Sequence, residues 1–145
     1  MSGPSTDPRP VVPRRSDDRT LDSLLGDVYR AFWEVMLLAA PVHLWLLLRR
    51  TVPLAERTAG VVAYPALVVA VGLLRGGWVA VGREWPSRRL DAGLVRVVVY
   101  SAGLAVAFVG GGILTAPALA AVWAVLAAVG TAVTVPQAAA LATSE

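Results

Sequence analysis

Residues 32–50 read FWEVMLLAAPVHLWLLLRR, and this run decides the fold class because it is long and apolar enough to cross a bilayer. About 20 helical residues span the hydrocarbon core at a rise of about 1.5 Å per residue. The run also contains an acid, Glu34, a proline, Pro41, and the only histidine of the chain, His43. Ionisable groups inside a membrane span are candidates for function by default. The stretch therefore predicts a membrane helix and identifies two residues whose role must be weighed.

The composition of the whole chain is typical of a membrane protein. Hydrophobic residues make up 57% of its 145 positions and the mean hydropathy is +0.65, whereas soluble domains contain roughly 45–50% apolar residues. The chain has no cysteine, which excludes disulfides and thiolate metal sites. All 13 basic residues are arginine, and alanine, valine and glycine are in excess. This bias is typical of a GC-rich genome and predicts a prokaryotic source.

Four apolar blocks of about 18–22 residues follow one another, and each is long enough to span a membrane as a helix. The blocks are residues 31–48, 58–77, 93–114 and 117–135. Three charged residues, Glu34, Arg75 and Arg96, lie within about a turn of a block's end, where long side chains can reach the headgroups. We therefore expect an all-α fold, an integral membrane four-helix bundle within residues 31–142.

The segment before the first block divides in two. Residues 1–19 are rich in proline, serine and charge, which predicts a disordered cytoplasmic tail. Thr20 can act as a helix N-cap, and apolar residues then recur at helical spacing. These are Leu21, Leu24, Leu25, Val28, Tyr29 and Phe32. We expect a short amphipathic helix over residues 20–30 that lies along the inner interface or extends the first membrane helix into the cytoplasm.

The distribution of arginine predicts the orientation. With the N-terminus inside, ten arginines lie in the cytoplasm and three outside, which is a clear positive-inside bias. The inner set is Arg9, Arg14, Arg15, Arg19, Arg30, Arg75, Arg83, Arg88, Arg89 and Arg96; the outer set is Arg49, Arg50 and Arg57. We expect a multi-pass protein of the cell membrane with both termini cytoplasmic. Charges beside apolar blocks set topology before they bind partners, so nucleic acid is not an expected partner.

The spacing of Glu34 and His43 argues against a joint site within one subunit. Nine residues put them on opposite faces of a helix and about 13 Å apart along it. Glu34 follows Arg30 by four residues, which favours an interfacial carboxylate paired with Arg30. His43 is expected to be a packed or hydrogen-bonded neutral histidine, and Pro41 to kink the helix beside it. The alternative, in which Glu34 and His43 form a transport or proton site, stays open.

Small residues recur every fourth position in the last two blocks. Small residues on one stripe let helix backbones approach closely in lipid. The third block contains Gly103, Ala107 and Gly111, and the stripe of the fourth comprises Ala116, Ala120, Ala124, Ala128 and Ala132. Because only two residues separate these blocks before Pro117 opens the last helix, we expect a tight antiparallel hairpin packed through these residues.

The sequence lacks the motifs of known enzyme sites. It contains no H-E-x-x-H, no G-x-S-x-G and a single histidine, so neither an enzyme activity nor a metal or cofactor is expected. We expect a non-catalytic accessory, scaffold or assembly subunit, with the lipid bilayer and either another membrane protein or a second copy as partners. The alternative is a small oligomeric transporter with Glu34 as its coupling carboxylate. A first helix that began near Leu21 would move Glu34 deeper and favour that alternative.

Overall fold

The computed structural model describes residues 20–49, 51–80, 85 and 90–142, and its regular elements in that part of the chain are all α-helices. The tail of residues 1–19, for which we expect disorder, lies outside the described residues. The five helices are α1 (Leu21–Leu38), α2 (Ala40–Leu48), α3 (Leu54–Arg75), α4 (Leu90–Ile113) and α5 (Pro117–Ala142).

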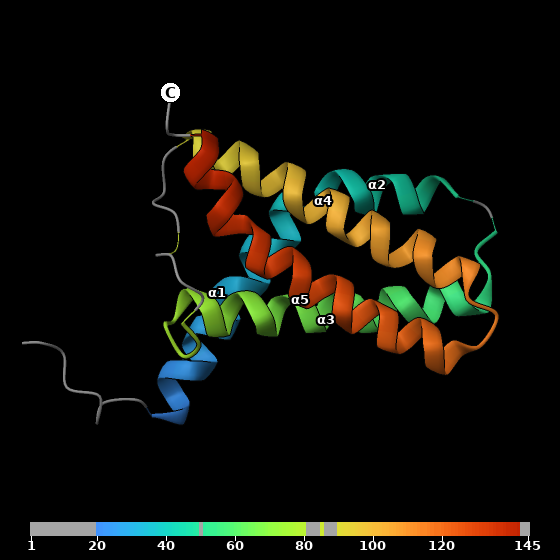
Figure 1. Ribbon diagram of the computed structural model, residues 1–145, viewed down its shortest axis with the longest axis horizontal. Helices are drawn as coiled ribbons and strands as arrows, with labels where there is room; N and C mark the ends of the chain where they lie inside the picture. Colours follow the sequence, from blue (N-terminus) through green and yellow to red (C-terminus); the bar gives the residue numbers. More distant parts are fainter. Residues whose placement is uncertain (1–19, 50, 81–84, 86–89, 143–145) are drawn as a thin grey trace, which may run out of the picture.

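The helices form an elongated bundle in which α3, α4 and α5 run along the long axis (Figure 1). We call the end that holds the last turn of α3 and the first turn of α4 the Arg75 end, and the opposite end, where α2 stops and α3 begins, the Arg49 end. α1 crosses α3 obliquely near the Arg75 end, and α2 continues beside α4 to the Arg49 end. α5 packs against both α3 and α4.

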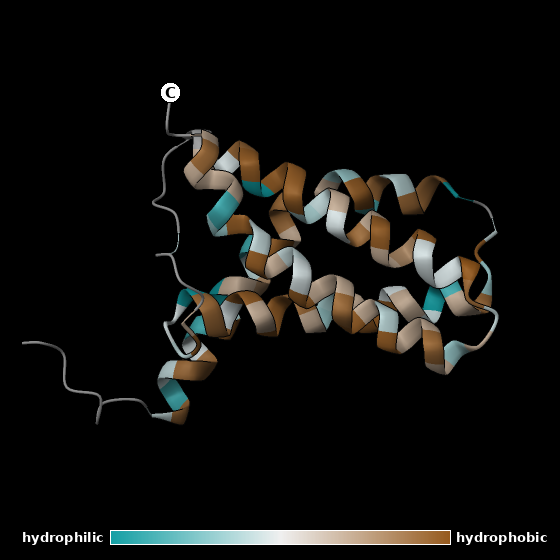
Figure 2. Cartoon of the chain, viewed as in Figure 1, coloured by the Kyte–Doolittle hydropathy of each residue, from teal (hydrophilic) through white to brown (hydrophobic). Residues whose placement is uncertain are grey.

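Three helices, α3, α4 and α5, are each long and apolar enough to cross a membrane. α1 and α2 meet this criterion only as a pair, bent by 56° at the break between them, which would bring the number of spans to four. Apolar residues follow these helices along their length, while hydrophilic residues gather toward the two ends of the bundle (Figure 2). The chain therefore has the build of a membrane protein.

The first apolar block is continuous with the segment before it, which is one of the two arrangements expected from the sequence, and it is broken near Pro41. α1 runs without interruption through residue 31, so the amphipathic segment of residues 20–30 and the start of the membrane segment are one helix. Its N-cap is Thr20, which accepts a hydrogen bond from the Ser23 amide at 3.4 Å. The break falls at Ala39, two residues before Pro41. Proline lacks the amide that would bond to the carbonyl four residues earlier and is tolerated in a helix's first turn, so α2 begins anew beside it.

The other helices are longer than the apolar blocks that predict them. α3 begins at Leu54 rather than residue 58, and α5 continues to Ala142, well past residue 135. α5 passes through Pro136 because its last turns are packed: Val135, Pro136 and Ala139 are all buried. A proline removes one helical hydrogen bond, and the burial of its neighbours offsets that loss.

Candidate functional site

The main polar cluster of the bundle forms around Glu34. Its Oε2 pairs with the guanidinium of Arg75, and its Oε1 accepts hydrogen bonds from Arg96 Nη1 at 3.3 Å and from the Tyr100 hydroxyl at 3.0 Å. The side chain of Glu34 is 10% exposed, that of Arg96 8% and that of Arg75 21%. A buried carboxylate requires such partners because desolvation of an unpaired charge is very unfavourable.

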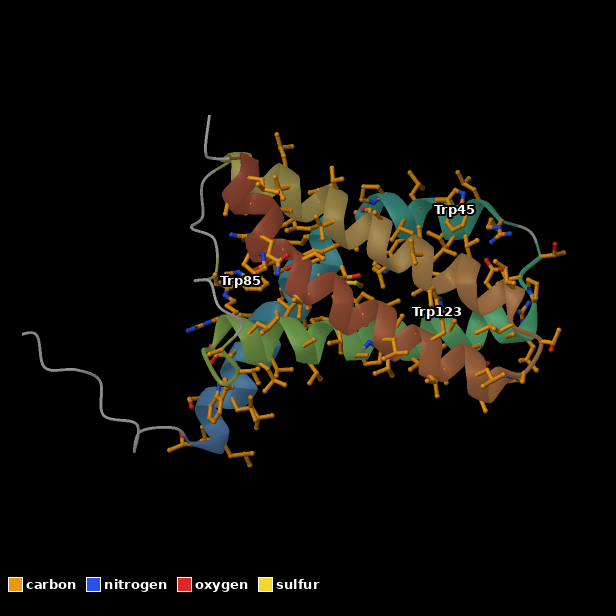
Figure 3. The ribbon with its side chains drawn as sticks, viewed as in Figure 1. Trp45, Trp85 and Trp123 are labelled. Carbon is orange, nitrogen blue, oxygen red and sulfur yellow. The ribbon has the colours of Figure 1, made fainter. Side chains whose placement is uncertain are left out.

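Three helices contribute to this Glu34 cluster. Arg75 is the last residue of α3, and Arg96 and Tyr100 are four residues apart on one face of α4. Glu34 comes from the flank of α1 that faces these helices. The guanidinium of Arg96 also lies 6.0 Å from the ring of Trp85, which Figure 3 shows near the Arg75 end. The cluster thus ties α1 to both helices that flank the loop after α3.

This geometry corrects the prediction that Glu34 pairs with Arg30 at the interface. Arg30 is 69% exposed and instead lies 3.9 Å from Asp27, three residues earlier on α1. Arg75 and Arg96 likewise do not simply extend to the headgroups, because both reach the carboxylate of Glu34. An ion pair between helices with an additional hydroxyl donor satisfies Glu34 better than an exposed pair on one helix, which contributes little.

Asp27 extends the contact of α1 with the Arg75 end. It lies seven residues before Glu34, on nearly the same face of the helix, and its Oδ2 accepts a hydrogen bond from Trp78 Nε1 at 3.3 Å. Trp78 follows a turn at Gly77, whose φ of +68° favours glycine. A side chain at Gly72 would press against the backbone of Val28, so glycine permits α1 and α3 to cross closely here. Sequence reasoning did not identify these contacts.

His43 lies in a separate place from Glu34. It is the fourth residue of α2, and its ring meets the ring of Tyr64 of α3, with 5.5 Å between centroids. The ring of Phe32 packs edge-to-face on the same tyrosine, with 6.3 Å between the ring centroids. The hydroxyl of Tyr64 is buried and makes no hydrogen bond to the part of the chain that the structure describes. The structure therefore places His43 in an aromatic cluster between α2 and α3, and it does not bring His43 and Glu34 together.

A second ion pair lies at the Arg49 end. Arg49 pairs with Glu56 of α3, whose carboxylate side chain is 5% exposed, and its guanidinium lies 4.9 Å from the ring of Trp45. Figure 3 shows Trp45 toward this end of the bundle. The pair ties the end of α2 to the start of α3. The sequence signal for this pair was Glu56, an acid directly before Arg57 at the edge of an apolar block. The pair was not predicted from the sequence.

The predicted packing residues lie between the last three helices. Ala107, Ala120, Ala124 and Ala128 are at most 2% exposed. A Cβ atom at Gly103 would overlap Thr131 of α5, whereas one at Gly111 would overlap Ala59 of α3. The stripe therefore serves a three-helix contact, because α5 packs against α3 as well as α4. Trp123 adds a hydrogen bond from its Nε1 to the Val106 carbonyl at 3.2 Å.

The chemistry open to the Glu34 cluster is limited by its partners. A carboxylate has about four lone-pair sites, and three donors already occupy sites on Glu34. Among the described residues, no group of three or more histidine, cysteine or acidic side chains is arranged to hold a metal ion. The arrangement connects helices by charge and hydrogen bonding.

Comparison with known proteins assigns the chain to a family. A family described as Domain of unknown function (DUF8215) matches residues 18–144, so the chain belongs to this family. No curated protein and no solved structure was found to match it. The matched range includes α1 to α5 and therefore every residue of the Glu34 cluster.

Proposed function

We propose that this member of the family is a non-catalytic, four-span integral membrane protein that acts as an accessory, scaffold or assembly subunit in the cell membrane. In this proposal α1 and α2 together form the first span, and α3, α4 and α5 form the other three. The Arg75 end, which carries Arg75 and Arg96, lies on the cytoplasmic side, in accord with the excess of arginine there.

The observation that carries the proposal is the binding of Glu34 by three donors from its own chain. Arg75, Arg96 and Tyr100 engage both carboxylate oxygens. A coupling carboxylate must release its partners to take up a proton or an ion, whereas a carboxylate held by two guanidinium groups fixes the positions of three helices. A rigid bundle of this kind suits a protein that presents surfaces to membrane partners rather than one that alternates between two states.

A small oligomeric transporter is the second candidate function. α1 begins at Leu21, which is the condition under which Glu34 would lie deeper in the membrane, and the α1–α2 pair is broken at Ala39. Broken helices frequently line the ion sites of transporters. Against this function, the partner of Glu34 on α3 is Arg75, the last residue of that helix. The carboxylate therefore lies close to one end of α3 rather than at the centre of the span.

The two functions are separated by purifying the tagged full chain from its native membranes in a mild detergent. The accessory function predicts that one other membrane protein is retained at a fixed ratio, and that deleting the chain lowers the amount of that protein in the membrane. The transporter function predicts that the purified chain alone, reconstituted in vesicles, moves a cation across the vesicle membrane in exchange for protons. It also predicts that Glu34→Gln abolishes this movement. The second result would overturn the proposal.

A further inference from the structure

Packing alone holds α2 weakly against the rest of the bundle. Val42 is the one buried residue of this helix, and its backbone lies near that of α4 rather than that of α3. Its large apolar side chains are mostly exposed; these are Leu44, Trp45, Leu47 and Leu48. Lipid solvates such side chains as well as protein does, so membrane helices are held by close packing and polar bonds. The apolar surface of α2 therefore does little to keep the helix in place.

The connection between α1 and α2 is a break at a single residue. The chain bends by 56° at Ala39, whose amide donates to the Val35 carbonyl at 2.9 Å and whose carbonyl accepts from the amides of Val42 and His43. Pro41 has no amide to bond to the carbonyl four residues earlier, so the series of helical hydrogen bonds is interrupted here. Hinges form at a few residues of this kind at the ends of helices.

The helices on the two sides of the break are held in different ways. α1 is fixed by the bonds of Glu34 to α3 and α4 and by the fully buried Ala31 and Val35. α2 is instead held at its far end, where Arg49 pairs with Glu56 of α3. The side chain of Glu56 is only 5% exposed, and a buried charge left without its partner is very unfavourable. This ion pair is therefore the main bond between α2 and the bundle.

From this arrangement we propose that α2 is a hinged arm that pivots at Ala39 while α1 stays fixed, and that the Arg49–Glu56 ion pair is the latch that keeps the arm closed. Opening of the arm separates the ring of His43 from that of Tyr64 and uncovers the buried hydroxyl of the tyrosine. The proposal rests on the membrane placement of α2, because water would drive its apolar side chains onto the bundle whereas lipid does not. It does not depend on the accessory role.

Distances between spin labels test the arm in the full chain, reconstituted in lipid nanodiscs. Leu47→Cys on α2 and Val109→Cys on α4 give the α2–α4 distance, since both positions are exposed and the chain has no cysteine of its own. Leu47 lies eight residues, or about 12 Å, from Ala39, so a pivot of about 30° would move it by about 6 Å. The wild-type chain should give one narrow distance. Glu56→Gln should add a second distance, longer by about 6 Å.

Two further variants and a second pair of labels serve as controls. Arg49→Gln should have the same effect as Glu56→Gln, because either substitution removes the ion pair. Arg57→Gln removes a charge at an exposed position next to Glu56 and should leave one narrow α2–α4 distance. Labels on Met36→Cys and Val98→Cys, both exposed, give an α1–α4 distance. It should keep its wild-type value in every variant, because α1 is fixed.

Three results would overturn the proposal. An unchanged α2–α4 distance in both Glu56→Gln and Arg49→Gln would mean that packing alone holds α2. An equal change of the α1–α4 distance would mean that the whole bundle loosens rather than one arm. An equal effect of Arg57→Gln would mean that the latch is not specific to the ion pair.

Alkaline extraction of native membranes separates this proposal from the proposed function. If the wild-type chain is released by alkali, the proposed membrane function fails together with the arm. If the chain stays in the membrane and the α2–α4 distance is unchanged in the two variants that lack the ion pair, only the arm is wrong.

Discussion

Replacing Glu34 with glutamine should destabilise the bundle far more than an exposed ion pair would explain. The side chains of Glu34 and Arg96 are 10% and 8% exposed, so neither is well screened by solvent. Removing one partner of a buried ion pair typically lowers the free energy of unfolding by about 3–5 kcal/mol. Glutamine keeps one acceptor oxygen for Tyr100, and Arg75 is 21% exposed. We therefore expect a loss of about 2–4 kcal/mol for Glu34→Gln.

The assay is unfolding of the purified chain in mixed micelles with increasing dodecyl sulfate, followed by circular dichroism. The matched control is Arg30→Gln on the same helix. Arg30 is 69% exposed and 3.9 Å from Asp27, so its loss should change the free energy of unfolding by about 0–0.5 kcal/mol. The double variant of Glu34→Gln with Arg96→Gln should be less destabilised than the sum of its single changes.

Equal free energies of unfolding for the Glu34→Gln and Arg30→Gln variants would refute this reasoning. It would mean that Glu34 is solvated at the interface and that the ion pairs to α3 and α4 contribute no stability. Strict additivity of Glu34→Gln and Arg96→Gln would likewise show that the two side chains do not interact.

Two further predictions concern the small residues between the helices. Ala124→Leu should lower the free energy of unfolding by about 1–3 kcal/mol through overpacking, because Ala124 is fully buried. The control Val125→Leu, at a position 41% exposed, should leave the stability in the same detergent melt nearly unchanged. Gly103→Ala should lower the melting temperature because the added methyl would overlap Thr131. Gly130→Ala should leave the melting temperature the same or raise it, because space is open there and alanine favours the helix. Equal melting temperatures of these two variants would argue against close packing of α4 on α5.

Length and hydropathy were sufficient to predict which segments are helical. The blocks of residues 58–77 and 93–114 correspond to α3 and α4 within a few residues at each end. The break at Ala39 was predicted only approximately, from Pro41. A proline fixes where a helical hydrogen bond is missing, but the packing around it decides where the chain bends.

The partners of Glu34 were harder to predict because they lie far away in the sequence. Arg75 and Arg96 are separated from Glu34 by 41 and 62 positions, while spacing rules for helices compare residues three or four positions apart. A signal was nevertheless present. The predicted topology put an acid and two arginines at the same end of three apolar blocks, and opposite charges at one depth in a membrane tend to pair. The contact of Arg49 with Glu56 follows the same rule at the other end.

The central claim, that α1 and α2 together cross the membrane as the first of four spans, is tested most directly by cysteine accessibility in intact cells. Single cysteines at Thr20, Thr51 and Thr115 report on the start of α1, the α2–α3 loop and the α4–α5 loop, all of which are exposed. We predict that an impermeant thiol reagent labels Thr51→Cys and Thr115→Cys, and labels Thr20→Cys only after the cells are permeabilised. Labelling of Thr20→Cys together with Thr51→Cys in intact cells would contradict the four-span bundle, because both ends of the bent pair would then lie on one side of the membrane.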